Sequence, residues 1–307
     1  MKGLVIKTTG SSYIVRMDDG SDVECHIKGN FRIRGIRSTN PVAVGDFVQV
    51  QAQEDGTNWI TEIEDRKNYI IRRATNLSKE THILAANIDQ AALIVTTNHP
   101  YTSPTFIDRF LATCEAYRVP AILIFNKVDL LDEDEFFEMM LIQAEYHHLG
   151  YTVAGMSVIN GVEEDFINKY LKDKVTLLAG NSGVGKSTFL NALFGQEMTR
   201  TGKISDAHDK GMHTTTFSEM YFLPQGGAVI DTPGIKGFGT VNFEREEVSH
   251  YFREIFQIGR ECRFADCTHT NEPGCAVLEA VEHGKIPMSR YESYISMLGD
   301  CDESKYR

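Results

Sequence analysis

The chain carries a glycine-rich stretch that fits the pattern G-x-x-x-x-G-K-[ST], namely Gly180-Asn181-Ser182-Gly183-Val184-Gly185-Lys186-Ser187. It follows an apolar strand expected at 175–179 and opens a helix expected at 188–194, which is the context that this pattern requires. The glycines let backbone N–H groups turn toward phosphate oxygens, and the start of the helix adds a favourable dipole. The stretch therefore predicts a loop for a nucleoside triphosphate rather than a purely structural turn, with Lys186 between the β- and γ-phosphates and Ser187 on Mg²⁺.

A second motif, Asn126-Lys127-Val128-Asp129, follows an apolar strand expected at 121–125. The end of such a strand is where α/β sheets place ligands. The motif is similar to the N-K-x-D motif of GTPases, in which the aspartate accepts hydrogen bonds from N1–H and the 2-amino group of guanine. Adenine lacks this pair of donors and would leave the carboxylate without partners. We expect Asp129 to select guanine, Lys127 to lie along the base and Asn126 to hold the loop, although alone the motif could also be a solvated turn.

A third motif, Asp231-Thr232-Pro233-Gly234, ends an apolar strand expected at 228–230 and resembles the D-x-x-G motif of GTPases. There the aspartate holds Mg²⁺ through water, and the N–H of Gly234 would meet the γ-phosphate. The segment 211–216 lies between this motif and the phosphate loop and ends in three threonines. We expect Thr215 to complete the Mg²⁺ shell, and the same threonines could also begin a strand expected at 217–223.

The order of these motifs differs from that of Ras-like GTPases, in which the phosphate loop comes first and N-K-x-D comes last. Here 126–129 precedes 180–187. The same sheet can be built if the old termini are joined and the chain is opened elsewhere, because the termini of a domain usually lie close together. The order therefore predicts a circularly permuted GTPase, whose D-x-x-G loop leads directly into the C-terminal part of the chain.

The expected catalytic group also departs from the Ras-like pattern. Ile235 follows the D-x-x-G motif, where Ras-like proteins carry a glutamine that orients water. An isoleucine cannot do this, so either hydrolysis is slow or another group takes the role. His213 lies in the threonine segment and can hydrogen-bond to water near neutral pH. We expect His213 to be catalytic, with a histidine that caps or packs its loop as the alternative.

Three of the six cysteines cluster beside a histidine in the pattern C-x4-C-x-H-x5-C, formed by Cys262, Cys267, His269 and Cys275. Three thiolates and one imidazole make a closed tetrahedral zinc set, and in a cytosolic chain such a cluster indicates a metal rather than disulfides. A complete set leaves no open position for catalysis, so we expect one structural Zn²⁺. The spacing is not the common C-x2-C, and three incidentally buried cysteines are the alternative.

The 307 residues are enough for two or three domains. Residues 1–68 contain about five strand-like segments, with a turn signal at Asp19-Gly20, which predicts a small OB-fold barrel with an SH3-like barrel as the rival. Residues 66–75 are expected to be a linker. We expect three parts: the barrel at 1–68, a GTPase domain at 69–240 with a parallel sheet covered on both faces, and a helical zinc-binding domain at 241–307.

The net charge of −12 argues against a nucleic-acid partner, but the charge is unevenly spread. Residues 1–74 hold 11 Lys+Arg against 10 Asp+Glu, so any RNA contact should lie there. The expected contacts alternate around Phe31, with a solvated loop as the alternative, and are Lys28, Arg32, Arg34 and Arg37. No stretch approaches 18 consecutive apolar residues, and the N-terminal apolar run is too short for a signal peptide, so we expect a cytoplasmic protein without membrane segments.

The combination of barrel, permuted GTPase and cysteine-rich tail resembles the bacterial ribosome small-subunit-dependent GTPase A family, as do the segments 107–110 and 201–205. The resemblance implies a factor for late assembly of the 30S subunit that binds 16S rRNA with GTP and leaves after subunit-stimulated hydrolysis. The resemblance implies that GTP or GDP binds to residues 126–129 and 180–188, the second of which ends at Thr188. It also implies that His213 is the catalytic histidine. Ser157 would contact the base, and the zinc ligands would be the four residues named above.

One alternative stays open on these grounds. The chain could be a GTP-gated RNA-binding module of another RNA-linked pathway, in which hydrolysis is incidental. In either case we expect a monomer.

Overall fold

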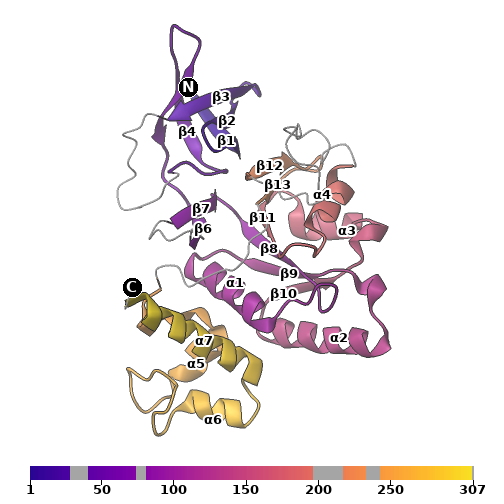
Figure 1. The fold of residues 1–307 in the computed structure, drawn as a ribbon, viewed down its shortest axis with the longest axis vertical. Helices are drawn as coiled ribbons and strands as arrows, with labels where there is room; N and C mark the ends of the chain where they lie inside the picture. Colours follow the sequence, from indigo (N-terminus) through magenta and orange to yellow (C-terminus); the bar gives the residue numbers. More distant parts are fainter. Residues whose placement is uncertain (28–40, 74–80, 196–216, 233–242, 306–307) are drawn as a thin grey trace.

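The computed structural model describes residues 1–27, 41–73, 81–195, 217–232 and 243–305. A β-barrel at the N-terminus, a central α/β part and a helical part at the C-terminus follow one another along the longest axis of the molecule (Figure 1). This arrangement confirms the predicted fold class. None of the helices within the described ranges is long and apolar enough to cross a membrane.

The barrel closes on itself and has the strand order of an OB-fold. Its strands are β1 (Lys2–Thr8), β2 (Tyr13–Met17), β3 (Asp22–Ile27), β4 (Phe47–Ala52) and β5 (Asn58–Ile63). They are hydrogen-bonded in the order β1-β2-β3-β5-β4, and β4 returns to β1. The pair β3–β5 is parallel, and the other pairs are antiparallel. This Greek-key order excludes the SH3-like alternative.

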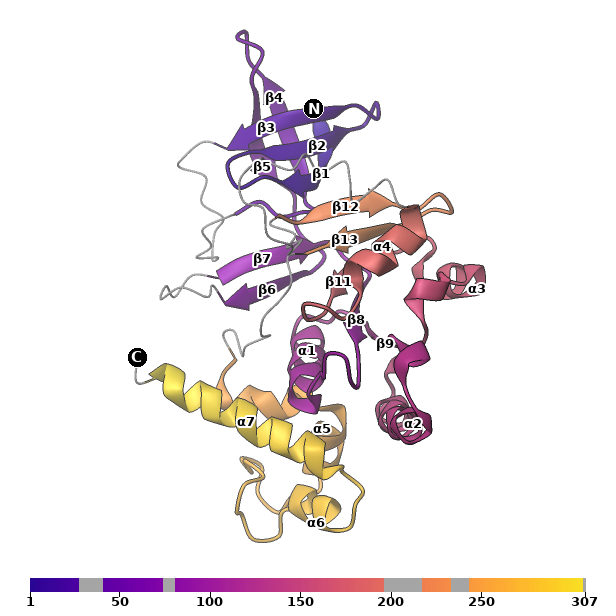
Figure 2. The same cartoon turned by 45° about the vertical axis from the view of Figure 1, so that its right-hand side comes forward.

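The predicted linker at 66–75 is wrong, because half of it, residues 69–73, forms a strand. β6 (Tyr69–Arg73) pairs antiparallel with β7 (Thr81–Ala86) in a separate sheet that lies beneath the barrel and beside the central sheet (Figure 2). Ile70 and Ile71 are buried, and Ile70 packs into the same core as Leu84. The Tyr-Ile-Ile run has high β-propensity, and burial of these isoleucines outweighs the charged residues that flank them.

A close backbone contact holds the barrel against β7. Gly45 has φ +94°, and a Cβ there would lie 2.0 Å from the carbonyl oxygen of Ala86, so only glycine fits. Beside it the buried carboxylate of Asp46 accepts hydrogen bonds from Nε and Nη2 of Arg66 at 2.7 and 2.6 Å. These contacts fix the direction in which the chain leaves the barrel.

The central sheet has the order β10-β9-β8-β11-β13-β12, with β12 antiparallel and the others parallel. The strand that leads into the phosphate loop therefore lies near the middle of the sheet, as expected for a permuted GTPase. The strands are β8 (Gln90–Val95), β9 (Ala121–Phe125), β10 (Thr152–Gly155), β11 (Val175–Ala179), β12 (Glu219–Phe222) and β13 (Ala228–Asp231).

Helices cover both faces of this sheet, because both faces of its strands are apolar. In β8, Leu93 and Val95 join the core under α1 (Pro104–Ala116) and α2 (Glu133–His148), while Ala92 and Ile94 join the core on the other face. That second face is covered by α3 (Glu164–Phe166), the π-helical turn after it (Ile167–Leu171) and α4 (Lys186–Phe194). A capping box of Asp132 and Glu135 starts α2.

The sheet is continuous with the barrel. β1 pairs antiparallel with β12, and the backbone N–H of Thr8 donates to the carbonyl of Ser218 at 3.1 Å. Lys7 and Glu219 form an ion pair across the same junction at 2.9 Å. The barrel is thus joined to the strand beside β13, whose last residue is Asp231.

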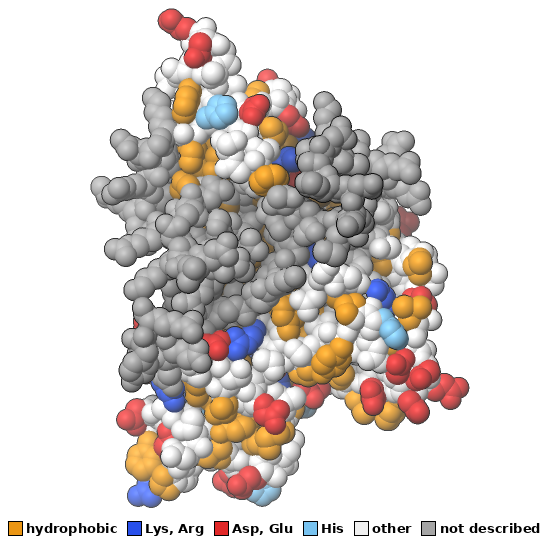
Figure 3. Space-filling model, viewed as in Figure 1, with side chains coloured by type: hydrophobic (Ala, Val, Ile, Leu, Met, Phe, Trp, Pro, Cys, Tyr) orange, Lys and Arg blue, Asp and Glu red, His pale blue; other side chains and the backbone are white. Residues whose placement is uncertain are grey.

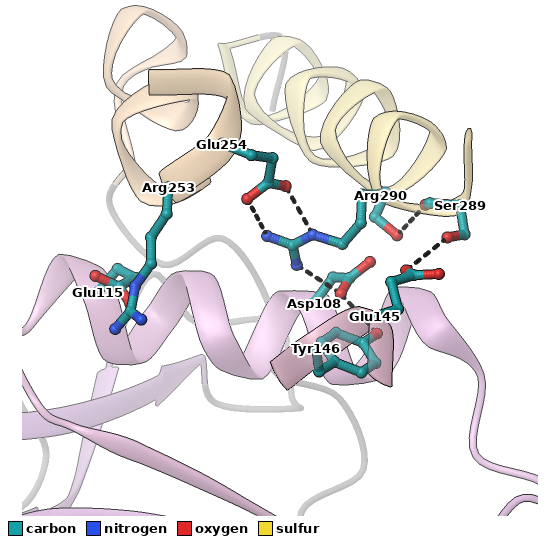
Figure 4. A network of polar contacts seen from close by, with 9 residues as sticks. Asp108, Glu115, Glu145, Tyr146, Arg253, Glu254, Ser289 and Arg290 are labelled. Atoms are coloured by element: carbon teal, nitrogen blue, oxygen red, sulfur yellow. Dashed lines mark hydrogen bonds and ion pairs between the residues drawn. The ribbon is translucent and has the colours of Figure 1, made fainter. Parts of the chain in front are cut away.

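The helical C-terminal part packs on α1 through a buried ion network. It consists of a 3₁₀ segment (Arg245–Tyr251), α5 (Arg253–Gly259), α6 (Ala276–Glu282) and α7 (Met288–Lys305). Arg290 of α7 lies between two carboxylates and donates to Asp108 of α1 at 2.6 Å and to Glu254 of α5 at 2.8 and 3.2 Å (Figure 4). Tyr146 of α2 also donates to Asp108, at 2.9 Å. Desolvation raises the pKa of Asp108, and the cation of Arg290 opposes this rise.

Asp108 belongs to the segment 107–110, for which the resemblance gave no role. Its neighbour Arg109 is ion-paired with Asp300 of α7 and donates to Ser296 at 3.0 Å. The segment therefore attaches the C-terminal helices to the first helix of the α/β part.

Replacing Arg290 by methionine should lower the free energy of unfolding by about 3–5 kcal/mol, because two buried carboxylates would lose their shared cation. Urea unfolding followed by circular dichroism measures this loss. The control Lys67→Met removes an exposed ion pair with Asp89 and should cost at most about 1 kcal/mol. Equal losses in the two variants would contradict the assigned role of the network.

Candidate functional site

The sequence motifs gather at one edge of the central sheet, where the parallel strands end. Phe125, the last residue of β9, is in register with Val95 of β8 and Gly155 of β10, and Ala179 of β11 lies beside Leu93. The base motif follows β9, the segment with Ser157 follows β10, and the phosphate loop follows β11. Asp231 is the last residue of β13. Parallel alignment thus brings together segments that are far apart in the sequence.

Asn126 joins three of these loops through its side-chain amide. It is 5% exposed, and its Nδ2 donates to the carbonyl oxygen of Val184 in the phosphate loop at 2.8 Å. Its Oδ1 accepts from the backbone N–H of Val158, at 3.0 Å. One side chain therefore uses both its donor and its acceptor to fix the spacing between the base motif, the phosphate loop and the loop after β10.

Asp129 and Ser157 lie side by side. The hydroxyl of Ser157 donates to the carboxylate of Asp129. The loops beneath them are connected by a hydrogen bond from the N–H of Val128 to the carbonyl of Met156, at 3.3 Å. Asp129 is exposed, so a ligand from solvent can reach its carboxylate.

Lys127 adopts a left-handed backbone with φ +64°, and its Nζ donates to the carbonyl of His99 at 2.6 Å. This contact shows a feature that sequence reasoning missed, namely the loop 96–103 after β8. The same loop reaches the phosphate loop, because a Cβ at Gly183 would lie 3.6 Å from Cδ of Pro100. The available signal was its position, since the loop follows a parallel strand whose end lies at the same sheet edge.

The phosphate loop has the backbone that its glycines permit. Gly180, Gly183 and Gly185 have φ values of +148°, +85° and +105°. A Cβ at Gly185 would lie 2.3 Å from Nδ2 of Asn126, so this position has no room for a side chain. α4 begins immediately afterwards, which directs its N-terminus toward the loop. Asn181, Ser182, Ser187 and Thr188 are exposed or partly exposed along it.

Lys186 lies folded over this loop. Its Nζ donates to the carbonyls of Gly180 and Asn181 at 2.6 and 2.9 Å. Burial lowers the pKa of this ammonium group, and the negative charge of Asp231 opposes the change. The ammonium group of Lys186 is therefore held beside the phosphate loop. Together with the backbone N–H groups of this loop, it can bind the oxygens of a polyphosphate.

The four predicted metal ligands come together in the C-terminal part. Their ligand atoms all lie within 4.8 Å of one another. Sγ of Cys262 is 3.8 Å from Sγ of Cys275, and both sulfurs are 3.5 Å from Nδ1 of His269. A tetrahedral zinc ion with bonds of about 2.3 Å to sulfur and about 2.0 Å to nitrogen needs S–S and S–N edges of about 3.8 and about 3.5 Å. The cluster therefore fits such an ion, with Cys267 as the fourth ligand.

Helix α7 supports the backbone of the cluster. The hydroxyl groups of Tyr291 and Tyr294 donate to the carbonyls of His269 and Thr268 at 2.9 and 2.7 Å. Burial raises the pKa of the Cys267 thiol to about 12, so a bound cation would displace thiol protons. A complete set of four protein ligands is typical of a structural rather than a catalytic site.

Several predicted residues lie outside the described residues. These are Thr215, His213, Gly234 and Ile235 at the phosphate end of the site, and Lys28, Arg32, Arg34 and Arg37 in the barrel.

The sheet order, the central phosphate loop and the earlier base motif define a circularly permuted P-loop GTPase. Comparison with known proteins gives the family. Residues 63–241 match the model described as RsgA GTPase, and residues 2–60 match the model of the RsgA N-terminal domain. The chain belongs to the RsgA GTPase family and is therefore a GTP-hydrolysing enzyme.

Relatives match along the whole chain. A protein from Phocaeicola vulgatus named small ribosomal subunit biogenesis GTPase RsgA is 60% identical over 100% of this chain and 99% of its own length. A protein of the same name from Bacteroides fragilis is 59% identical with the same coverage. YjeQ from Thermotoga maritima has a similar structure with a TM-score of 0.74, 33% identity and 98% coverage of both chains. YloQ, described as a circularly permuted GTPase, has a TM-score of 0.70 and 30% identity, with 100% of this chain and 96% of that chain covered.

The substitution Gly185→Ala should disrupt the junction between the loops, because the new Cβ would displace the amide of Asn126. We expect faster hydrogen exchange at the Val158 amide, together with a loss of about 2–3 kcal/mol from backbone strain and the broken hydrogen bond. Exchange followed by NMR measures both the site and the size of the effect.

The control Gly195→Ala carries similar backbone strain at φ +85°, but a Cβ there meets no atom within 4 Å. It should leave the Val158 amide protected. If exchange at Val158 rises equally in both variants, Asn126 does not hold the loops as the geometry indicates.

Proposed function

We propose that this chain hydrolyses GTP in the maturation of the small ribosomal subunit, which it binds with GTP and leaves after hydrolysis. The observation that carries the proposal is the bridge through Asn126, which fixes a base motif and a phosphate loop at one sheet edge. The relatives from P. vulgatus and B. fragilis, which match along their whole length, are named for GTP hydrolysis and for biogenesis of this subunit.

In this proposal the nucleotide lies across the bridge. Asp129 accepts hydrogen bonds from guanine, with Ser157 beside it and Lys127 along the base. The hydrogen bond between Ser157 and Asp129 supports the pairing, because it already orients the carboxylate. The triphosphate lies on the backbone of the phosphate loop, and Lys186 exchanges its two carbonyl partners for β- and γ-phosphate oxygens.

Magnesium and the attacking water occupy the far end of the site. Ser187 and Thr215 hold Mg²⁺ directly, Asp231 holds it through water, and the N–H of Gly234 contacts the γ-phosphate. His213 orients the attacking water. The position of Asp231 at the end of β13, where its charge acts on Lys186, supports its assignment to this end.

The finer parts of the proposal concern the partners. The barrel contacts 16S rRNA through Lys28, Arg32, Arg34 and Arg37, which is consistent with the more balanced charge of residues 1–74.

The four-ligand cluster holds one structural Zn²⁺, which the distances between its ligand atoms support. The protein acts in the cytoplasm as a monomer. The rival role as a GTP-gated module of another pathway is not favoured, because the named relatives are small-subunit GTPases.

Purified small ribosomal subunits should raise the GTP turnover of this protein more than about tenfold, because the subunit completes the arrangement around the γ-phosphate. His213→Ala should remove this stimulation, a loss of more than about tenfold, and leave GTP binding intact. Phosphate release with and without subunits measures both effects.

The control His147→Ala changes an exposed histidine on α2 and should keep full stimulation. Turnover that does not respond to the subunit would remove the ribosomal part of the proposal. Stimulation that survives His213→Ala would assign the water to another group.

The purified protein should contain one zinc ion per chain, measured by mass spectrometry of the metal. Cys275→Ala should lose the ion and expose the backbone around α6 and α7 to hydrogen exchange, since the cluster holds these helices together. The control Cys25→Ala removes a buried thiol of the barrel and should keep the metal. A protein that is metal-free yet fully protected in α6 and α7 would contradict the zinc assignment.

A further inference from the structure

A groove lies between α2 and β10, on the side of the base motif away from the phosphate loop. Its volume is about 560 Å³. Phe136, Met139, Met140 and Gln143 line one wall, and Met156 lies on the other. The spacing of the four helical residues places them on one stripe of α2. Asp129 and Ser157 form one end of the groove.

The stripe is unusually exposed for apolar side chains. Phe136 is 41% exposed and Met140 51% exposed. Of the 15 large apolar side chains that are exposed among the described residues, six lie between 130 and 159, namely Leu130, Phe136, Phe137, Met140, Leu141 and Ile159. Of these six, Phe136 and Met140 line the groove, and exposed apolar side chains beside a hollow are typical of a surface that another molecule covers. Methionine side chains suit such a surface, because they adapt to the shape of a partner.

The groove also contains a polar group that lacks a partner. Nε2 of Gln143 is buried from solvent and has no hydrogen-bond partner within the described part of the chain. It lies against Gly155, where a Cβ would approach it to 2.9 Å. Because this nitrogen is closed off from solvent, the contacts that the groove offers to an occupant are the apolar side chains of α2 and Met156.

The charge around the groove determines which occupant fits. Residues 128–168 contain ten Asp and Glu and no Lys or Arg. Acidic side chains gather around the end of the molecule where α2 lies (Figure 3). A nucleic acid would be repelled, and so would the same surface of a second copy of this chain. The complementary partner carries apolar side chains flanked by lysine or arginine.

We propose that the groove between α2 and β10 binds a short basic segment of a partner protein, which inserts apolar side chains beside Met140 and Met156. This inference goes beyond the proposed function: the groove reaches Asp129 and Ser157 at the base motif, but the two side chains that contact the peptide, Met140 and Met156, are not assigned to the nucleotide. Peptides are recognised in a similar way in other helix-lined grooves, where apolar side chains of the peptide act as anchors.

The methionines of the groove allow a direct test. The protein is labelled with ¹³C at its methionine methyl groups, saturated with GDP and titrated with a synthetic peptide of repeated Leu-Lys-Lys-Leu units. The signals of Met139, Met140 and Met156 should shift in a saturable way, while those of Met17 in the barrel and Met220 in β12 stay in place. Added salt should weaken the binding, because part of the attraction is between exposed charges.

Two neighbouring substitutions separate docking in the groove from general attraction to an acidic surface. Met140→Lys and Leu141→Lys add the same charge at side chains of similar exposure, 51% and 56%, but only Met140 lines the groove. Met140→Lys should weaken binding more than tenfold, and Leu141→Lys should change it less than about threefold, as expected when only one side chain contacts the peptide. Thermal unfolding checks that both variants fold.

Matched peptides and dilution give the results that would overturn the proposal. Peptides of Leu-Glu-Glu-Leu and Ser-Lys-Lys-Ser units should not shift the groove methionines, because one lacks the charge and the other lacks the apolar anchors. Equal binding of either peptide, or equal losses in the two lysine variants, would refute a specific groove. Shifts of the same methionines on concentration of the protein alone would assign the groove to a second copy of this chain.

Discussion

The amide of Asn126 is the contact on which the rest of the site depends. It is buried, and it donates to the phosphate loop while it accepts from the loop after β10. Three segments that lie up to 58 residues from one another in sequence are thereby held at one spacing. The bond also explains why Gly185 must lack a side chain, since its Cα faces the same amide. A circular permutation changes the order of these segments along the chain but leaves this contact between them unchanged.

The site is also built into a larger framework. The loop 96–103, which contacts Lys127 and the phosphate loop, leads directly into α1. α1 in turn carries Asp108 and Arg109, which attach α7. On the other side, β1 of the barrel is paired with β12. The barrel and the C-terminal helices are therefore both attached to elements adjacent to the site. A change in the loops of the site would reach each of them through one or two elements.

Local patterns in the sequence were enough to predict most of the central part. The phosphate loop and the strand before it were recognisable because glycine, lysine and an apolar run occur at fixed spacing, and the order β10-β9-β8-β11-β13-β12 agrees with the predicted permutation. The cysteine cluster was recognisable for the same reason, since its ligands lie within 14 residues of one another. In each case neighbouring residues carry the chemistry.

Features that depend on distant partners could not be predicted in this way. The Tyr-Ile-Ile run that begins at Tyr69 favours a strand, but nothing near it indicates that the partner strand lies at 81–86. The ion network around Arg290 joins residues 182 positions apart, and the loop 96–103 has no motif of its own. The groove beside α2 depends on how this helix packs against β10, which the sequence does not show. Only the absence of Lys and Arg from 128–168 is visible in the sequence. For His213 and Thr215 the predictions stand on sequence alone.

The central claim is that the pocket spanned by Asn126 selects guanine through Asp129. Displacement calorimetry on the zinc- and magnesium-loaded protein tests it most directly, with GDP and ADP competing for the same site. The account predicts that GDP binds at least about 100-fold more tightly, because two hydrogen bonds to a carboxylate are worth roughly 3 kcal/mol or more. Equal affinities for GDP and ADP would contradict it.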